Sequence, residues 1–263
     1  MPDDRVHGSG FGRFGKRERL ILRKALAVIP VRYSASRFPG KPLALIAGKP
    51  MVQRVVEGVR SCRSLDRVIV ATDDARIFET VRGFGAEAMM TSPHHASGTD
   101  RVAEIAAAFN HPIVINVQGD EPLVEGRMLE GLVEVLQDPD LPMASLMARV
   151  SELSLLFEPH RVKVTTDAAG YALYFSRAPI PHGADDFFFQ HIGIYGYQRG
   201  FLLGFNALPP SRLERMERLE QLRVLESGFR IKMIEVERPT LSVDVPEDIM
   251  KVEKFLFEKR AHE

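Results

Sequence analysis

The stretch "VIPVRYSASRFPGKP", residues 28–42, begins as an apolar strand and continues as a basic loop. The apolar run reaches back to Ala25, and the loop carries three cations, Arg32, Arg37 and Lys41. Arginine binds phosphate oxygens through a planar fork, and lysine contributes a compact charge. We interpret the segment as a strand that delivers a triphosphate-binding loop. The alternative, which the loop alone leaves open, is a solvated turn.

Beyond this loop, strand patterns alternate with helix patterns. Apolar runs at 67–72 and 112–117 are typical of buried strands, and 51–62 and 99–109 have the spacing of amphipathic helices. Strands that alternate with helices favour a mainly parallel sheet covered on both faces. The sequence therefore predicts an α/β fold with a mainly parallel mixed sheet.

The pattern changes after residue 150. Residues 161–177 read as two strands around a turn, which predicts a β-hairpin, and 190–198 read as a further strand. The charged run at 213–227 predicts one long helix. We expect a small antiparallel subdomain at about residues 165–215.

The N-terminal residues differ in composition from the rest. Residues 1–24 are rich in Gly and Arg without apolar periodicity, and we expect a flexible extension before a single domain at 25–263. Gly10, Gly12 and Gly15 match the dinucleotide-binding pattern G-x-G-x-x-G. That pattern requires a preceding strand, which is missing here, so we interpret it as a chance match.

Composition excludes several classes of partner. Lys plus Arg equals Asp plus Glu, at 35 each, so no overall basic field favours nucleic acid or a membrane surface. No apolar run is long enough to span a bilayer, and we see no secretory signal. Cys62 is the single cysteine, which excludes an intramolecular disulfide and a cysteine zinc site. We expect a cytoplasmic protein.

Loops that follow strands are the candidate binding segments, because ligands of open α/β sheets bind beyond the carboxyl ends of the strands. In "ATDD", residues 71–74, Asp73 or Asp74 can cap the next helix. The functional alternative places this strand end against a nucleobase.

The segment "HHASGTDR", residues 94–101, combines a structural and a binding signal. Ser97 and Asp100 have capping-box spacing before an alanine-rich helix. Gly98 and the helix N-terminus also favour an anion or another polar ligand. The two adjacent histidines have poor geometry for one metal ion, and we interpret them as solvated.

Acidic residues follow two further strands. In "NVQGDEP", residues 116–122, Asp120 and Glu121 reach the sheet edge and face the basic loop. Mg²⁺ takes one or two carboxylates together with substrate phosphates, so we expect magnesium there. Asp244 in "SVDVPED" follows a strand and is a candidate second anchor. The alternative for the first segment is a helix cap before residues 125–132, and Asp248 in the second segment is interpreted as compensating the dipole in the first turn of the next helix. No spacing rule pairs Asp120 with Asp244.

Eight motifs in this order resemble a known family. They are "IPVRYSASRFPGKPL", "VATDD", "SGTDR", "NVQGDEP", "YALYFSRAPIP", "HIGIYGY", "LEQLRVLE" and "VDVPED". Together they resemble 3-deoxy-manno-octulosonate cytidylyltransferase, also called CMP-Kdo synthetase, over about residues 25–257. The resemblance implies a Rossmann-like nucleotide-diphospho-sugar transferase fold and a homodimer built through the second-half subdomain. It also implies the reaction of CTP with 3-deoxy-D-manno-octulosonate (Kdo) to give CMP-Kdo and diphosphate for lipopolysaccharide biosynthesis.

The resemblance also assigns residues to roles. The CTP site would comprise Arg32, Arg37, Lys41, Ala71, Thr72, Asp73, Ser97 and Gly98, with the strand end at 71–73 facing cytosine. The Kdo site would comprise Gln118, Arg177, His191, Tyr195, Glu220 and Gln221. Magnesium would bind Asp120 and Asp244, and the catalytic residues would be Arg32, Lys41, Asp120 and Asp244.

Some of the assigned residues also have purely structural interpretations, and the sequence differs from the family pattern at a few positions. Tyr195 and His191 could pack within the sheet, and Glu220 could lie on a solvated helix face. Asp100 stands where the family usually carries Glu. The segment "HGADDFFFQ", residues 182–190, is short for the family, and we expect its three phenylalanines to be exposed. Transfer to another sugar acid, or a non-catalytic nucleotide-binding protein, remains the alternative function.

Overall fold

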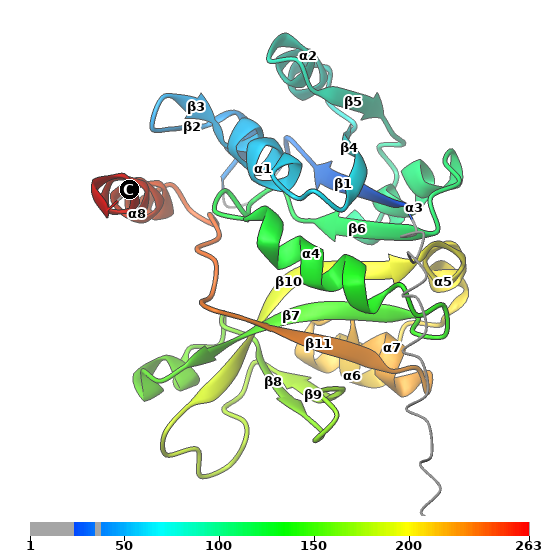
Figure 1. Ribbon diagram of the computed structural model, residues 1–263, viewed down its shortest axis with the longest axis vertical. Helices are drawn as coiled ribbons and strands as arrows, with labels where there is room; N and C mark the ends of the chain where they lie inside the picture. Colours follow the sequence, from blue (N-terminus) through cyan, green and yellow to red (C-terminus); the bar gives the residue numbers. More distant parts are fainter. Residues whose placement is uncertain (1–23, 35–37, 263) are drawn as a thin grey trace, which may run out of the picture.

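A computed structural model describes residues 24–34 and 38–262, and its centre is one mixed sheet (Figure 1). Nine of the described strands join this sheet, and its main path runs β11-β7-β10-β6-β1-β4-β5. The strands are β1 (Ala25–Val31), β4 (Leu65–Thr72), β5 (Glu87–Met90), β6 (Ile113–Val117), β7 (Met143–Val150), β8 (Lys163–Thr166), β9 (Ala172–Ser176), β10 (Phe188–Gln198) and β11 (Ile231–Val236). A separate two-stranded ribbon pairs β2 (Leu45–Ile46) with β3 (Lys49–Pro50).

Helices follow most of the strands. The α-helices are α1 (Met51–Arg60), α2 (Ala75–Gly83), α3 (Gly98–Ala107), α4 (Gly126–Val135), α5 (Arg199–Gly204), α6 (Arg212–Glu217), α7 (Leu222–Glu226) and α8 (Glu247–His262). The short 3₁₀ helices are η1 (Lys41–Leu43), η2 (Leu153–Phe157) and η3 (Phe205–Ala207).

The sheet is parallel in its first half and mixed in its second. β1 pairs in parallel with β4 and β6, and β4 pairs in parallel with β5. β10 runs antiparallel between β6 and β7, and β11 returns parallel to β7. This arrangement confirms the predicted α/β fold with a mixed sheet.

Side chains of β1 alternate between two apolar cores, as the pleat of a strand requires. Ala25, Ala27 and Ile29 pack with apolar residues of α1, α2 and α4. Leu26 and Val28 pack on the opposite face with residues of α3, α5 and α7. A strand buried on both faces has no polar side to expose, which explains its uninterrupted apolar sequence.

The predicted hairpin is present, because β8 and β9 pair antiparallel and β8 also pairs with β10. The expected exposure of the three phenylalanines is wrong. Phe188 is buried against Val150 and Leu156, whereas Phe187 and Phe189 are partly buried and their ring centroids lie 5.3 Å apart. Alternation along an extended chain places the middle ring on the opposite face from its neighbours.

The expected long helix at 213–227 is also wrong, because the chain breaks into α6 and α7. Arg218 ends α6 in the left-handed conformation, with φ of 54°. The turn buries Leu219 and Gln221, which are 6% and 3% exposed. The burial of these two side chains favours a turn, whereas the spacing of the charged residues favours one continuous helix.

Helices α1 and α4 meet with the backbone in direct contact at Gly126. A Cβ added there would lie 2.3 Å from the backbone nitrogen of Cys62 and 2.4 Å from the carbonyl carbon of Ser61. Backbone atoms cannot move aside as the end of a flexible side chain can. Only glycine therefore fits the first residue of α4 without a shift of one helix.

We expect Gly126→Ala to lower the free energy of unfolding by about 1–3 kcal/mol, the usual cost of overpacking. Urea denaturation followed by circular dichroism measures the change. Gly83→Ala is the matched control, because it lies in a helix and a Cβ there would meet no heavy atom within 4 Å. Equal stability of the two variants would contradict the close contact.

Candidate active site

Three of the candidate loops meet at the carboxyl ends of β1 and β6. They line a cavity of about 250 Å³ with Arg32, Lys41, Gly98, Gln118 and Asp120 among its walls. The structure thus confirms that the basic strand-end loop, the start of α3 and the acidic loop after β6 lie together. They meet where the switch-point rule for open α/β sheets predicts a ligand.

Lys41 links the two predicted metal aspartates. Its Nζ lies 2.8 Å from Asp120 Oδ2 and 3.9 Å from Asp244 Oδ1, and donates a 2.6 Å hydrogen bond to the carbonyl oxygen of Val243. The backbone N–H of Val243 in turn donates to the carbonyl oxygen of Asp120 at 3.0 Å. Residues far apart in the sequence therefore converge on one positive charge.

The donor set at this point fits magnesium. Asp120 and Asp244 supply carboxylate oxygens, the ligands that Mg²⁺ prefers, and both already face a cation. Within the described residues, no group of three or more His, Cys, Asp or Glu side chains forms a metal cage. Mg²⁺ commonly takes only one or two carboxylates and completes its shell with substrate oxygens and water, so two aspartates suffice.

Glu121 does not share this position, which corrects the expectation that both carboxylates face the basic loop. It is 7% exposed, and its side chain forms a hydrogen bond with Thr240. Burial, with the negative charge of Asp120, raises the pKa of Glu121 to about 8. Successive side chains leave the loop in different directions, and only Asp120 faces Lys41.

Arg32 lies at the cavity wall and is held by a backbone group. Its Nη2 donates a 2.6 Å hydrogen bond to the carbonyl oxygen of His95. The His95 ring also bonds to Glu104 on α3, a contact at the surface that the sequence did not predict. The predicted role of Arg37 lies outside the described residues.

The strand end at 71–74 divides its two aspartates between two tasks. Asp74 caps α2 by accepting from the backbone N–H of Arg76 at 2.9 Å. Asp73 accepts a 2.8 Å hydrogen bond from the fully buried Arg101 of α3. Ala71 and Thr72, which the resemblance assigns to cytosine, are fully buried at the end of β4.

The start of α3 carries the predicted capping box. Ser97 accepts from the backbone N–H of Asp100, whose carboxylate accepts from the backbone N–H of Ser97. Asp100 therefore keeps the capping role despite its shorter side chain. Gly98 lies close to Gln118, whose Nε2 donates to Asn116 Oδ1 at 3.0 Å.

Several residues assigned to the sugar acid also form one polar cluster. The Tyr195 hydroxyl donates to Gln221 Oε1 at 3.3 Å, and the rings of Tyr195 and His191 lie 5.5 Å apart. Glu220, on the turn between α6 and α7, accepts from the hydroxyl of Thr99 in α3. The break in the expected long helix is what brings this turn to the sheet.

Charge in this cluster is limited by burial. Burial lowers the pKa of His191 to about 3, and its Nε2 lies 2.9 Å from Ser145 Oγ. Burial also raises the pKa of Glu220, against hydrogen bonds that lower it. His191 is therefore a neutral, packed ring, as the alternative interpretation stated, and it supplies no positive charge for a carboxylate.

Arg177 is oriented by backbone carbonyls. Its Nε donates to the carbonyl oxygen of Glu217 at 2.9 Å, and its Nη1 donates to that of Pro159 at 3.1 Å. The Glu217 carboxylate accepts from the backbone N–H of Arg177 at 2.9 Å and from Ser176 Oγ. These contacts join β9 to α6.

Sequence reasoning missed the residues that support the site. Arg101, Thr99 and Asn116 are buried polar groups that hold the assigned residues. Arg101 has a detectable signal, since it precedes Ile105 by four residues and so lies on the core-facing side of an amphipathic helix. A charge at such a position indicates a buried partner.

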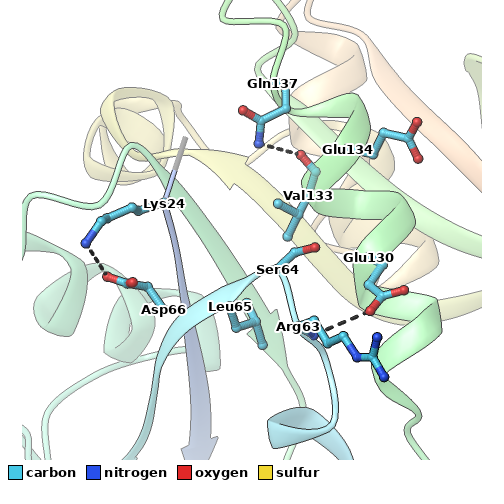
Figure 2. Close-up of a pocket in the computed structure, with 9 residues that line it drawn as sticks. All are labelled: Lys24, Arg63, Ser64, Leu65, Asp66, Glu130, Val133, Glu134 and Gln137. Atoms are coloured by element: carbon cyan, nitrogen blue, oxygen red, sulfur yellow. Dashed lines mark hydrogen bonds and ion pairs between the residues drawn. The ribbon is translucent and has the colours of Figure 1, made fainter. Parts of the chain in front are cut away.

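A second hollow, of about 410 Å³, lies at the opposite edge of the sheet (Figure 2). It is lined by the start of β4 and by side chains of α4. Two of its charged side chains pair with each other, Lys24 and Asp66, and the backbone N–H of Arg63 donates to Glu130. The amino ends of parallel strands do not form the ligand crevice of this fold, so we place the site at the smaller cavity.

Comparison with known proteins shows which family the chain is similar to. A family model described as cytidylyltransferase matches residues 26–234. The 3-deoxy-manno-octulosonate cytidylyltransferase of Syntrophotalea carbinolica is 51% identical over 243 residues, covering 88% of this chain and 97% of the relative. The structure of CMP:2-keto-3-deoxy-manno-octonic acid synthetase complexed with CTP matches with TM-score 0.86 at 42% identity, covering 90% of this chain and 99% of that one.

A more distant structure shares the fold alone. It is 4-diphosphocytidyl-2C-methyl-D-erythritol synthase from Anaerococcus prevotii, with TM-score 0.62 at 11% identity over 89% of this chain and 98% of that one. The fold and the matching family define the chain as a cytidylyltransferase of the nucleotidyltransferase class. Within that class, the chain belongs to the 3-deoxy-manno-octulosonate cytidylyltransferase family. In the part of the chain that the structure describes, no helix is long and apolar enough to cross a membrane.

Proposed function

We propose that the protein joins CTP to Kdo, releasing diphosphate and CMP-Kdo for lipopolysaccharide biosynthesis. The observation that carries the proposal is the placement of Lys41 between Asp120 and Asp244, at a cavity that Arg32 also lines. Cations bind a polyphosphate there, and the aspartates provide a site for a divalent ion. The names of the similar proteins support CTP and Kdo as the substrates.

In this reaction, the anomeric hydroxyl of Kdo attacks the α-phosphorus of CTP. A new oxygen–phosphorus bond forms as the bond from the α-phosphorus to the bridging oxygen breaks, and diphosphate leaves with the electron pair. The hydroxyl loses its proton to solvent in the same reaction. Positioning and charge neutralisation supply most of the catalysis in phosphoryl-transfer chemistry. Arg32 and Lys41 would stabilise the charge that grows on the leaving diphosphate.

Magnesium is part of the proposal. Asp120 and Asp244 would hold it, and it would supply charge neutralisation at the α-phosphate. In the structure the single positive charge of Lys41 faces both carboxylates and offsets part of their charge. The carboxylate of Kdo and the triphosphate of CTP would then repel each other less when the Kdo hydroxyl approaches the α-phosphorus.

The sugar acid would contact the cluster of Gln118, Tyr195, Glu220 and Gln221. Its hydroxyl groups match the amide and carboxyl groups of this cluster. The resemblance assigns Arg177 to the sugar carboxylate, and Arg177 would supply a positive charge for it if its guanidinium turned away from the backbone carbonyls of Glu217 and Pro159. Among the residues that the structure describes, the buried amide nitrogen Gln221 Nε2 has no hydrogen-bond partner, and a ligand oxygen would satisfy it.

We also propose a cytoplasmic homodimer that associates through the second-half subdomain. Leu173 on β9 and Met216 on α6 are 61% and 66% exposed. The two elements lie side by side, because Ser176 of β9 bonds to Glu217 of α6. Exposed apolar side chains on adjacent elements favour a protein contact there.

The test is diphosphate release by the purified protein with CTP, Mg²⁺ and a series of sugar acids. We expect turnover with Kdo, and weaker turnover with sialic acid or an amino-substituted Kdo. Replacing CTP by other nucleoside triphosphates gives the base specificity. Tight CTP binding without any diphosphate release would instead identify a non-catalytic nucleotide-binding protein.

A further inference from the structure

The loop of residues 92–95, called the 92–95 loop below, contacts Arg32 through its backbone. The carbonyl oxygen of His95 accepts the 2.6 Å hydrogen bond from Arg32 Nη2. A guanidinium has five N–H donors in a rigid plane, and one carbonyl uses one of them. The position of this carbonyl oxygen therefore restricts the directions in which the guanidinium of Arg32 can present its remaining N–H donors to the cavity.

Glu104 fastens both ends of the 92–95 loop to α3. Its Oε2 accepts from the backbone N–H of Ser92 at 3.0 Å and also bonds to His95 Nε2. Glu104 lies between Val102 and Ile105, which are buried in the core, so it projects from a firmly packed helix. One carboxylate oxygen thus joins a rigid element to the loop that holds Arg32.

The chemistry of Glu104 suits this task. Partial burial acts to raise its pKa, but the hydrogen bonds from His95 and Ser92 outweigh burial and lower it. The carboxylate is therefore retained as an acceptor for two donors. The side chains of His95 and Glu104 are 20% and 40% exposed, and exposed pairs of this kind contribute little to global stability. The contacts fix local geometry more than they stabilise the fold.

We propose that Glu104 is a positioning residue for Arg32, acting through His95 and the 92–95 loop on binding of the CTP phosphates. Neither His95 nor Glu104 lines the cavity. The inference rests on the proposed function, because it requires Arg32 to contact the triphosphate.

Steady-state kinetics with CTP and Kdo test the inference on Glu104→Ala, Arg32→Ala and the double variant. We expect Glu104→Ala to raise KM for CTP by about tenfold, with less than about a twofold change in KM for Kdo. In the Arg32→Ala background, Glu104→Ala should change KM for CTP by less than about twofold, because residues in one network are not additive. His95→Ala should act in the same direction as Glu104→Ala.

Two further variants keep the test decisive. Glu79→Ala is the matched control, an exposed glutamate on the surface of α2 that should leave both KM values unchanged. Glu104→Gln retains one acceptor oxygen and should recover part of the loss, and it replaces Glu104→Ala if the alanine variant does not fold.

Two results would overturn the inference in different ways. If Arg32→Ala leaves KM for CTP unchanged, the proposed contact of Arg32 with phosphate is refuted, and the positioning role falls with it. If Arg32→Ala has a large effect and Glu104→Ala multiplies it, the positioning role alone is refuted. Equal increases in both KM values for Glu104→Ala would also indicate a merely structural residue.

Discussion

Asp120→Asn is expected to lower kcat/KM by about a thousandfold, the upper range for removing one preorganised electrostatic group from a reaction centre. The amide keeps the shape of the side chain and removes its charge. Lys41 then loses its charged partner at 2.8 Å, and the proposed divalent ion would lose one of the two carboxylates proposed to hold it. The diphosphate assay with Kdo measures the rate, and a magnesium titration of each variant separates metal binding from chemistry.

Asp244→Asn should produce a loss of similar size, and the double variant should be little worse than either single one. Groups that act as a unit in catalysis are strongly non-additive. Asp140→Asn is the matched control, because Asp140 is exposed in the turn between α4 and β7. Losses that multiply, or a magnesium midpoint that neither variant shifts, would contradict a shared ion between Asp120 and Asp244.

The sequence was sufficient to predict which loops lie together, because every parallel sheet places the carboxyl ends of its strands at one edge. Parallel strands bring their carboxyl ends to one edge, so the residues after β1 and β6 were expected to meet. The cavity lined by Arg32, Gly98 and Asp120 confirms this for three loops. The capping box at Ser97 was equally predictable, since it depends on neighbours three residues apart.

Contacts between distant side chains and backbone groups could not be predicted in the same way. The carbonyl oxygen of His95 holds Arg32, but every residue has a carbonyl, so the sequence carries no sign of this bond. Asp244 reaches Lys41 only because the segment after β11 crosses to the end of β6, where Val243 bonds to Asp120. Such pairings depend on the path of the chain and not on local spacing.

The break between α6 and α7 shows where local periodicity misleads. Charged residues at 213–227 favour one solvated helix, but burial of Leu219 and Gln221 decides the structure. The left-handed conformation of Arg218 is unfavourable for a residue with a side chain. Tertiary contacts therefore outweigh both the helix pattern and this local cost.

Arg101 should dominate the stability of the first half of the chain. Its side chain is fully buried, and its Nη2 bonds to Asp73 while its Nη1 bonds to the hydroxyl of Thr91. Removing one partner of a buried pair leaves an uncompensated charge, which costs about 3–5 kcal/mol. We therefore expect Arg101→Met to lower the free energy of unfolding by about that amount, measured by urea denaturation.

A neighbouring ion pair provides a control with the same chemistry and different burial. Arg76 bonds to Asp74 at 2.6 Å, but the Arg76 side chain is 59% exposed, so Arg76→Met should change stability little. The double variant Arg101→Met with Asp73→Asn should recover part of the loss, because the partly buried carboxylate, whose side chain is 20% exposed, then carries no charge. If Arg101→Met were as stable as Arg76→Met, the exposed part of the Asp73 carboxylate would be enough to solvate its charge without Arg101.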